Sequence, residues 1–137
     1  MATILVIDDE RMVCDLLRAV FSRYGHEVLT AFDGRNGLDL FEQHRPRFTL
    51  LDLRMPGMNG IEVLTRIRAL DPRAAVIVLT GAGSADLENQ ARQMGVTDFL
   101  SKGLSLEALL GTVERVMQQP VKPPVSPAQS KIGRAHV

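Results

Sequence analysis

The sequence predicts an α/β protein with a doubly wound, open, five-stranded parallel sheet and five helices. Three observations lead to this fold class. Short apolar runs alternate with segments of helical apolar spacing up to residue 118, and the connections between them are short. The runs "TILVI" and "AAVIVLT" are apolar almost throughout, as expected of parallel strands that helices cover on both faces.

The first strand is expected at Thr3–Ile7, where a β-branched run ends at the acidic residues Asp8–Glu10. Apolar residues at helical spacing then predict a helix over Met12–Tyr24. Gly25 ends that helix, since glycine favours the left-handed conformation that closes many helices. The second strand is expected at Glu27–Ala31.

Asp33 is expected to cap the second helix, because its carboxylate can accept a hydrogen bond from a free amide of the first turn. That helix runs to about Arg45, and Pro46 marks the break after it. The third strand is expected at Phe48–Leu53, and the letters "MPGMNG" after it predict a tight loop.

Asn59 is expected to cap the third helix, with Glu62 completing an asparagine version of the capping box. This helix runs to about Leu70, where the letters "DP" end it. The fourth strand is expected at Ala74–Thr80, which is the most apolar run of the chain.

Ser84 is expected to cap the fourth helix, which runs to Met94 and is closed by Gly95. The fifth strand is expected at Val96–Leu100. Ser105 is expected to cap a last helix, whose apolar stripe is Leu106, Leu109, Leu110, Val113, Val116 and Met117.

The composition is that of one soluble globular domain. The chain has 137 residues with 16 basic and 16 acidic side chains, so its net charge near zero argues against a nucleic-acid-binding surface. Cys14 is the one cysteine, which excludes an internal disulfide, and its place beside a helical stripe indicates plain packing. No apolar run approaches the ~18 residues of a membrane-spanning helix. We expect a cytoplasmic protein without a membrane partner.

Polar side chains gather where the predicted strands end. They are Asp8, Asp9, Asp52, Thr80 and Lys102. In open parallel sheets ligands bind outside the carboxyl ends of the strands, so these side chains are expected to meet at one edge. Crowded carboxylates need a cation, and an oxygen-only cluster suits Mg²⁺. With a lysine and a hydroxyl, such a site supplies what phosphoryl transfer to an aspartate requires.

Four motifs at these strand ends resemble the receiver domain of two-component response regulators. They are "VIDDE", "LLDLRMPGMNG", "VIVLTG" and "FLSKG", and the resemblance covers residues 2–118. It implies the flavodoxin-like strand order 2-1-3-4-5. It also implies a bacterial phosphorelay protein that receives a phosphoryl group from a histidine kinase or phosphotransfer protein. Such a protein is no enzyme beyond phosphorylating itself from a donor and slowly hydrolysing the acyl phosphate.

The resemblance also assigns roles within the site. It implies that Asp52 is the phosphoacceptor and that Lys102 pairs with a phosphoryl oxygen. Asp9 would bind Mg²⁺ directly and Asp8 through water. Asp52 and the backbone carbonyl of Arg54 would be further ligands of the metal.

Thr80 and Phe99 are implied as the switch residues. Thr80 would hydrogen-bond a phosphoryl oxygen, and Phe99 occupies the family's aromatic switch position. Phosphorylation would draw Thr80 toward Asp52 and let Phe99 turn inward. The face formed by the fourth helix, the fifth strand and the fifth helix would then change its binding partner or form a homodimer.

The chain departs from the family pattern around the site. Gly103 follows Lys102 where the family usually has a proline joined by a cis peptide bond, which leaves the lysine less constrained. Phe99 replaces the commoner tyrosine and lacks its hydroxyl. Arg54 and Ala82 flank the site, and we hypothesise that Arg54 shields the acyl phosphate from water. The phosphorylated state would then be long-lived.

Two other functions stay open on the sequence. A receiver-fold interaction module that works without phosphorylation is favoured only by the Lys102–Gly103 pair. A small phosphatase-like hydrolase would need a proton-donating acid just beyond Asp52, where Arg54 and Met55 stand instead.

The composition changes near the end of the chain. We expect a receiver domain over 1–119 and a Pro/Ser-rich linker over 120–131, since "PVKPPVSPAQS" has no apolar periodicity. The letters "IGRAHV" at 132–137 resemble a translated sequencing adapter, so a non-native tail is expected there. In the family such linkers usually lead to an output domain, so we expect a fragment of a longer regulator, with a stand-alone receiver as the alternative.

Overall fold

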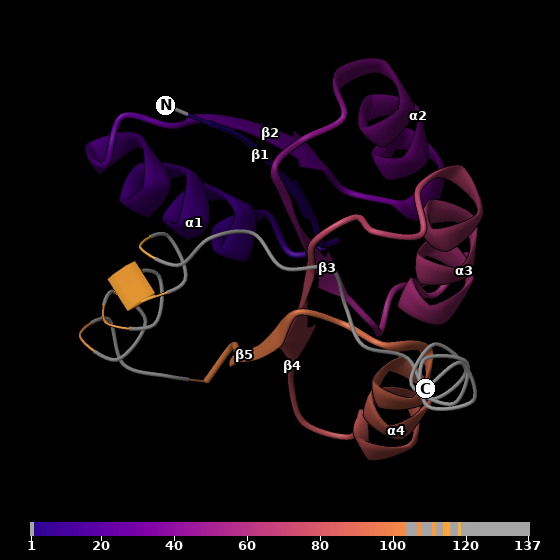
Figure 1. Cartoon of the computed structure of the whole chain (residues 1–137). Helices are drawn as coiled ribbons and strands as arrows, with labels where there is room; N and C mark the ends of the chain where they lie inside the picture. The colour runs from indigo at the N-terminus through magenta and orange to yellow at the C-terminus, as the bar shows by residue number, and fades with distance from the viewer. Residues whose placement is uncertain (1, 104–106, 108–110, 112–113, 116–117, 119–137) are drawn as a thin grey trace, which may run out of the picture.

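The described residues form five strands and four helices (Figure 1). This computed structural model describes residues 2–103, 107, 111, 114, 115 and 118. The strands are β1 (Thr3–Ile7), β2 (Glu27–Ala31), β3 (Phe48–Asp52), β4 (Val76–Thr80) and β5 (Asp98–Ser101). The helices are α1 (Arg11–Arg23), α2 (Gly34–His44), α3 (Gly60–Leu70) and α4 (Ala85–Met94). Ser105, the stripe of the fifth predicted helix, the linker and the tail lie outside the described residues.

All five strands are parallel in the order β2-β1-β3-β4-β5, which confirms the predicted fold class and strand order. The register pairs Ile7 with Ala31 on one side and with Leu51 on the other. At the other edge of the sheet it pairs Thr80 with Ser101. Because the strands start and stop nearly level, their carboxyl ends form one continuous edge, and the loops after β1, β3, β4 and β5 meet there.

Helix α1 covers one face of the sheet, and α2, α3 and α4 cover the other (Figure 1). Successive strand residues therefore alternate between two hydrophobic layers. The α1 layer contains Ile4, Val6, Leu50, Leu79, Cys14, Leu17, Val20 and Phe21. The opposite layer contains Leu5, Ile7, Leu51, Val78, Phe41, Val63, Leu64, Ile67 and Ala91. Cys14 is buried as predicted, and burial raises the pKa of its thiol to about 11.

Of the three predicted helix caps that lie among the described residues, two are confirmed. Asp33 accepts a hydrogen bond from the amide of Asn36 at 2.8 Å, and Asn59 accepts one from the amide of Glu62 at 3.1 Å. Ser84 holds the N-cap position of α4, but its hydroxyl accepts no bond from the helix. Its backbone has ψ of 15° instead of an extended value, so the side chain does not reach the free amides.

Several boundaries differ by one or two residues from those expected. Strand β5 was expected at 96–100 and lies at Asp98–Ser101, because its ladder with β4 begins at the pair of Ile77 with Asp98. Strand β4 begins at Val76, while the amide of Ala74 is used in a turn with Asp71. Helix α1 begins and ends one residue earlier than expected.

The loop after β3 turns as tightly as the letters "MPGMNG" predict. Gly57 has φ of +77°, a conformation that other residues rarely adopt. Gly60 is required for a different reason, since a Cβ there would stand 2.4 Å from the backbone oxygen of Asp52. Its amide donates to the carbonyl of Leu53 at 2.9 Å. The start of α3 is thereby held directly against the end of β3.

Candidate functional site

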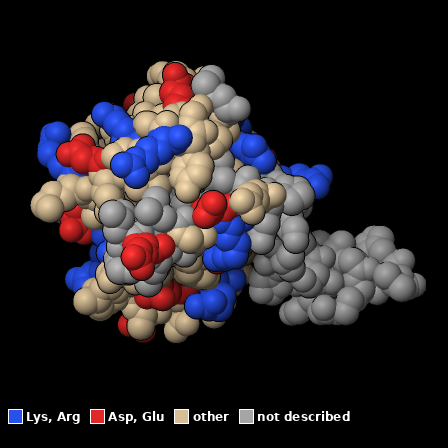
Figure 2. Space-filling view, turned by 90° about the vertical axis from the view of Figure 1, so that its left-hand side faces the viewer, with Lys and Arg blue, Asp and Glu red and all other residues tan. Residues whose placement is uncertain are grey.

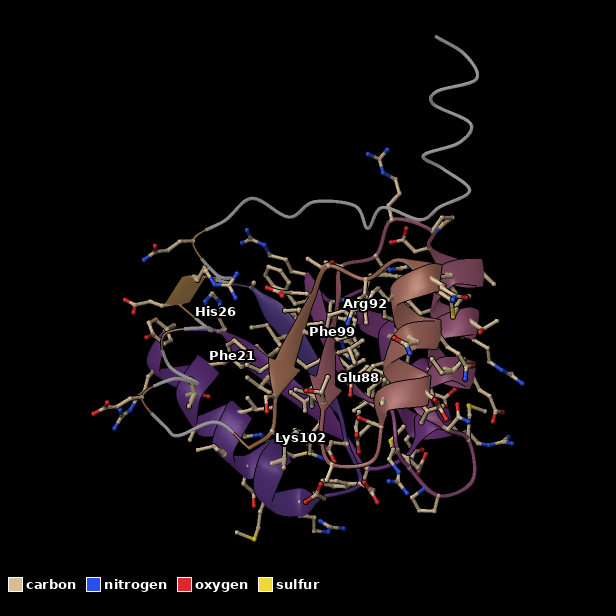
Figure 3. All side chains as sticks on the ribbon, turned by 90° about the horizontal axis from the view of Figure 1, so that it is seen from below. Phe21, His26, Glu88, Arg92, Phe99 and Lys102 are labelled. Carbon is tan, nitrogen blue, oxygen red and sulfur yellow. The ribbon has the colours of Figure 1, made fainter. Side chains whose placement is uncertain are left out.

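A hollow of about 450 Å³ opens at the carboxyl edge of the sheet. It lies where the loops after β1, β3, β4 and β5 meet. Its lining residues are Glu10, Val13, Asp52, Arg54, Gly81, Ala82, Ser84, Lys102 and Gly103. Of the five side chains predicted at the strand ends, Asp52 and Lys102 line this hollow. Lys102 stands at the end of β5 in Figure 3.

Three carboxylates converge at this edge. One oxygen each of Asp8, Glu10 and Asp52 lies within 4.8 Å of the other two. Asp8 is fully buried and Asp52 is 4% exposed. Asp9 is exposed and is not part of this group. No role was predicted for Glu10, although the letters "DDE" already contain a third acid.

Lys102 reaches into the carboxylate group. Its Nζ lies 3.1 Å from Oδ2 of Asp8 and 3.4 Å from Oδ2 of Asp52, and it also forms an ion pair with Glu10. The amide of Lys102 donates to the carbonyl of Thr80 at 2.8 Å, which ties the end of β5 to the end of β4. No cis peptide bond occurs among the described residues, so Lys102–Gly103 is trans. The missing proline therefore does not keep the lysine out of the site.

The two buried aspartates are electrostatically unfavourable neighbours. Burial, followed by the charge of Asp8, raises the pKa of Asp52, and the charge of Lys102 opposes both; the net effect is a pKa of about 7. Burial also raises the pKa of Asp8, against a hydrogen bond from the amide of Glu10 and the charge of Lys102. For Lys102, burial lowers the pKa, but hydrogen bonds to Glu10 and Asp8 and the charge of Asp52 outweigh it and raise the pKa overall.

Two carboxylate oxygens of the site are free to bind a cation. Oδ2 of Asp8 and Oδ2 of Asp52 are buried and accept no hydrogen bond, although the Lys102 ammonium is near both. Oxygen atoms left in this way are the ligands that hard divalent cations take. Three carboxylates against one ammonium also leave the group with net negative charge. Asp8 and Asp52, whose free oxygens are buried here, could therefore hold a metal such as Mg²⁺.

Arg54 bridges two loops beside Asp52. Its amide donates to Oδ1 of Asp52 at 3.3 Å. Its guanidinium Nη1 donates to the carbonyls of Ala82 and Gly83 at 3.3 and 3.2 Å. The side chain thus runs from the loop after β3 to the loop after β4, along the lining of the hollow.

The two predicted switch residues lie on β4 and β5. Thr80 is half-buried at the end of β4, and its carbonyl accepts the bond from Lys102. Phe99 is half-buried on the side of the sheet that α4 covers. The guanidinium carbon of Arg92 lies 4.5 Å from the centre of the Phe99 ring, and Figure 3 shows the two side by side. This stacking was not visible in the sequence, because it joins separate elements.

Ser84 organises the loop between β4 and α4. Its hydroxyl lies 2.8 Å from the carbonyl of Gly81 and 2.7 Å from the carboxylate of Glu88. Ser84 is 2% exposed, so these contacts hold the loop from inside.

The molecular surface carries mixed charge: Figure 2 shows basic and acidic side chains interspersed over the face it presents.

Comparison with known proteins identifies the family of the chain. A family model described as "Response regulator receiver domain" matches residues 4–114. Sporulation initiation phosphotransferase F of Bacillus subtilis is 31% identical over 114 residues, which cover 83% of this chain and 92% of that protein. Regulatory protein AtoC of Escherichia coli is 35% identical over 115 residues, which cover 84% of this chain and 25% of AtoC.

Solved structures agree with these relatives. Chemotaxis protein CheY4 of Vibrio cholerae superposes with a TM-score of 0.75 at 30% identity, over 85% of this chain and 98% of that one. NtrX of Brucella abortus superposes with a TM-score of 0.77 at 32% identity, over 85% of this chain and 27% of that one. The chain therefore spans nearly all of some relatives and about a quarter of others.

The group of Asp8, Glu10 and Asp52 beside Lys102 is typical of receivers that accept a phosphoryl group. A receiver is a signalling domain and not a classical enzyme, and it implies a kinase or phosphotransfer partner. Within the part of the chain that the structure describes, every helix is too short or too polar to cross a membrane.

The raised pKa of Asp52 predicts how stability depends on pH. An ordinary aspartate has a pKa of 3.8, and Asp52 in the folded protein has a pKa of about 7. Between these two pH values the folded state keeps a proton that the unfolded state has lost. Stability from this group therefore falls as pH rises through that window. We expect Asp52→Asn to stabilise the metal-free protein at pH 8 by about 1–3 kcal/mol, and the gain to vanish near pH 4.

Urea denaturation in EDTA at several pH values measures this difference. Asp39→Asn, which removes an exposed carboxylate on α2, is the matched control and should change stability little. An Asp52→Asn variant less stable than wild type at pH 8 would contradict the account. It would mean that attraction to Lys102 outweighs burial and the repulsion from Asp8.

Proposed function

Because the chain belongs to the response regulator receiver domain family, we propose that it accepts a phosphoryl group on Asp52 in a Mg²⁺-dependent reaction. The donor would be a histidine kinase or a phosphotransfer protein. The observation that carries the proposal is the placement of Asp52, whose side chain is 6% exposed and whose Oδ2 lies 3.4 Å from the Lys102 ammonium. A buried carboxylate with a cation beside it is suited to become an acyl phosphate.

In the reaction an oxygen of Asp52 attacks the phosphorus of the donor's phosphohistidine. The new bond joins that oxygen to phosphorus, and the phosphorus–nitrogen bond to the donor breaks. Lys102 then pairs with one phosphoryl oxygen, and the hydroxyl of Thr80 donates a hydrogen bond to another. The metal, when bound, supplies positive charge to the phosphoryl oxygens.

We propose that Asp8, Asp9, Asp52 and the backbone carbonyl of Arg54 hold the metal. The buried oxygens of Asp8 and Asp52 that accept no hydrogen bond support the first and third of these. Asp9 adjoins Asp8 at the end of β1 and is exposed, so its carboxylate is accessible from solvent. Oxygen donors of this kind, with water completing the shell, are what Mg²⁺ prefers.

The switch in this proposal joins Thr80 to Phe99. Thr80 would move toward the phosphoryl group, and Phe99 would turn inward, so that the surface formed by α4, β5 and the segment after β5 changes its partner. Phe99 is half-buried beneath the Arg92 guanidinium, so its ring is not enclosed by the core, which supports its role as the residue that turns. This surface would also serve a homodimer.

We propose that the receiver domain spans 1–119 and acts in the cytoplasm. A linker would follow at 120–131 and a non-native tail at 132–137, and the output domain would lie outside this chain.

A phosphorylation-independent interaction module is the alternative. Its support was the missing proline after Lys102, and the ion pair of Lys102 with Asp52 weakens that argument. Burial beside Asp8 raises the pKa of Asp52, which costs stability when Asp52 is charged. An interaction module that is not phosphorylated would gain nothing in return for this cost. We therefore favour the phosphorylated switch.

Intact-mass spectrometry with acetyl phosphate tests the proposed chemistry. We expect a phosphate adduct on the wild type in Mg²⁺, and none in EDTA or on Asp52→Ala. Asp39→Ala, in an exposed carboxylate of α2, should form the adduct like wild type. A folded wild-type protein without an adduct in any condition would favour the interaction module.

The position of the Arg54 side chain leads to a prediction for the lifetime of the phosphate adduct. Its side chain runs along the hollow to Ala82 and Gly83, where it would limit access of water to the acyl phosphate. We expect Arg54→Ala to speed dephosphorylation at least about threefold, equal to roughly 0.7 kcal/mol of barrier. Loss of adduct after removal of the donor measures the rate, with the exposed Arg73→Ala as control. An unchanged or slower rate in Arg54→Ala would refute the shielding.

A further inference from the structure

Glu10 is a third carboxylate of the site with a place unlike the other two. It lies at the N-terminal end of α1, and its carboxylate forms the closest of the ion pairs that Lys102 makes. Its side chain is 59% exposed, whereas those of Asp8 and Asp52 are 0% and 6% exposed. Glu10 therefore binds the lysine from the solvent side, and the aspartates bind it from inside.

The two aspartates are held in place and Glu10 is not. Oδ1 of Asp8 accepts the amide of Glu10 at 2.9 Å, and Oδ1 of Asp52 accepts the amide of Arg54 at 3.3 Å. These backbone bonds and burial fix both carboxylates. Among the residues that the structure describes, the carboxylate of Glu10 pairs with the Lys102 ammonium alone. It can turn into solvent by rotation of its own side chain.

A phosphoryl group on Asp52 would compete with Glu10 for the Lys102 ammonium. The Lys102 ammonium has three protons to donate. In the structure it already pairs with three carboxylates, those of Asp8, Glu10 and Asp52. A phosphoryl group brings nearly two negative charges, so it would attract Lys102 and repel the Glu10 carboxylate. Asp8 and Asp52 cannot leave, and Glu10 can.

We propose that Glu10 is a displaceable counter-ion, which holds Lys102 in the unphosphorylated protein and is expelled to solvent when a phosphoryl group arrives on Asp52. The proposal rests on the proposed function and deepens it by naming a residue that opposes phosphorylation. Glu10 acts through Lys102, so it is a positioning residue and not a ligand of the phosphoryl group. Its contact sets how readily the unphosphorylated protein gives up Lys102.

The test uses beryllofluoride, which mimics a phosphoryl group on an aspartate without a donor protein. Isothermal titration at saturating Mg²⁺ gives its affinity for wild type, Glu10→Gln and the control Asp15→Asn. Gln keeps the length of the side chain and removes its charge. Asp15 is an exposed carboxylate on the same helix, away from Lys102. Titration with Mg²⁺ alone is run on each protein as a separate readout.

We expect Glu10→Gln to bind beryllofluoride about two- to fivefold more tightly than wild type, the range that loss of a partly exposed ion pair supports. Asp15→Asn should bind as wild type does, and Mg²⁺ affinity should change little in either variant. The advantage of Glu10→Gln should shrink as NaCl is raised, because salt screens an exposed pair. A purely structural role for Glu10 would not give this salt dependence.

Equal or weaker beryllofluoride binding by Glu10→Gln would overturn the proposal while leaving phosphorylation of Asp52 intact. Mg²⁺ binding weakened by about tenfold or more would also overturn it, since Glu10 would then be a metal ligand. A folded wild-type protein that binds no beryllofluoride would overturn the proposed function together with this inference. The first two outcomes are thereby distinguishable from the third.

Discussion

Two buried carboxylates, Asp8 and Asp52, lie side by side at the edge of the sheet, and their mutual repulsion in a poorly solvated place is the constraint on which the site depends. Neither can be fully charged without help, which is why burial and the neighbouring charge raise the pKa of Asp52 to about 7. Lys102 relieves the repulsion only in part, because three acids surround one ammonium. The site is therefore arranged to gain a cation.

The fold keeps these charges together at a cost that the hydrophobic layers offset. Strands β1 and β3 are buried on both faces, and their parallel register brings their carboxyl ends to the same level. The close approach of Gly60 to the backbone of Asp52 fixes the loop beneath it. The bond from Lys102 to Thr80 carries the lysine in from the far strand. Rigid elements thus position every charge except the carboxylate of Glu10.

Much of this arrangement was predictable, because it depends on patterns with a simple period. Apolar runs gave the strands, and the rule that ligands bind at carboxyl ends of parallel strands brought Asp8, Asp52 and Lys102 together. Glu10 was missed because the letters "DDE" do not tell which acids point inward; that depends on backbone angles at the start of α1. The failed cap at Ser84 has the same cause, since ψ of 15° directs its hydroxyl to Gly81 and Glu88. The stacking of Arg92 on Phe99 joins two elements and leaves no signal in either.

The most direct test is a crystal structure of the protein grown with Mg²⁺ and beryllofluoride. We expect the beryllium to be joined to an oxygen of Asp52, a fluorine to lie against Lys102 Nζ, and Mg²⁺ to contact the buried oxygen of Asp52. Beryllofluoride bound elsewhere, or a Lys102 side chain turned away from it, would contradict the central claim that this crowded edge exists to receive a phosphoryl group.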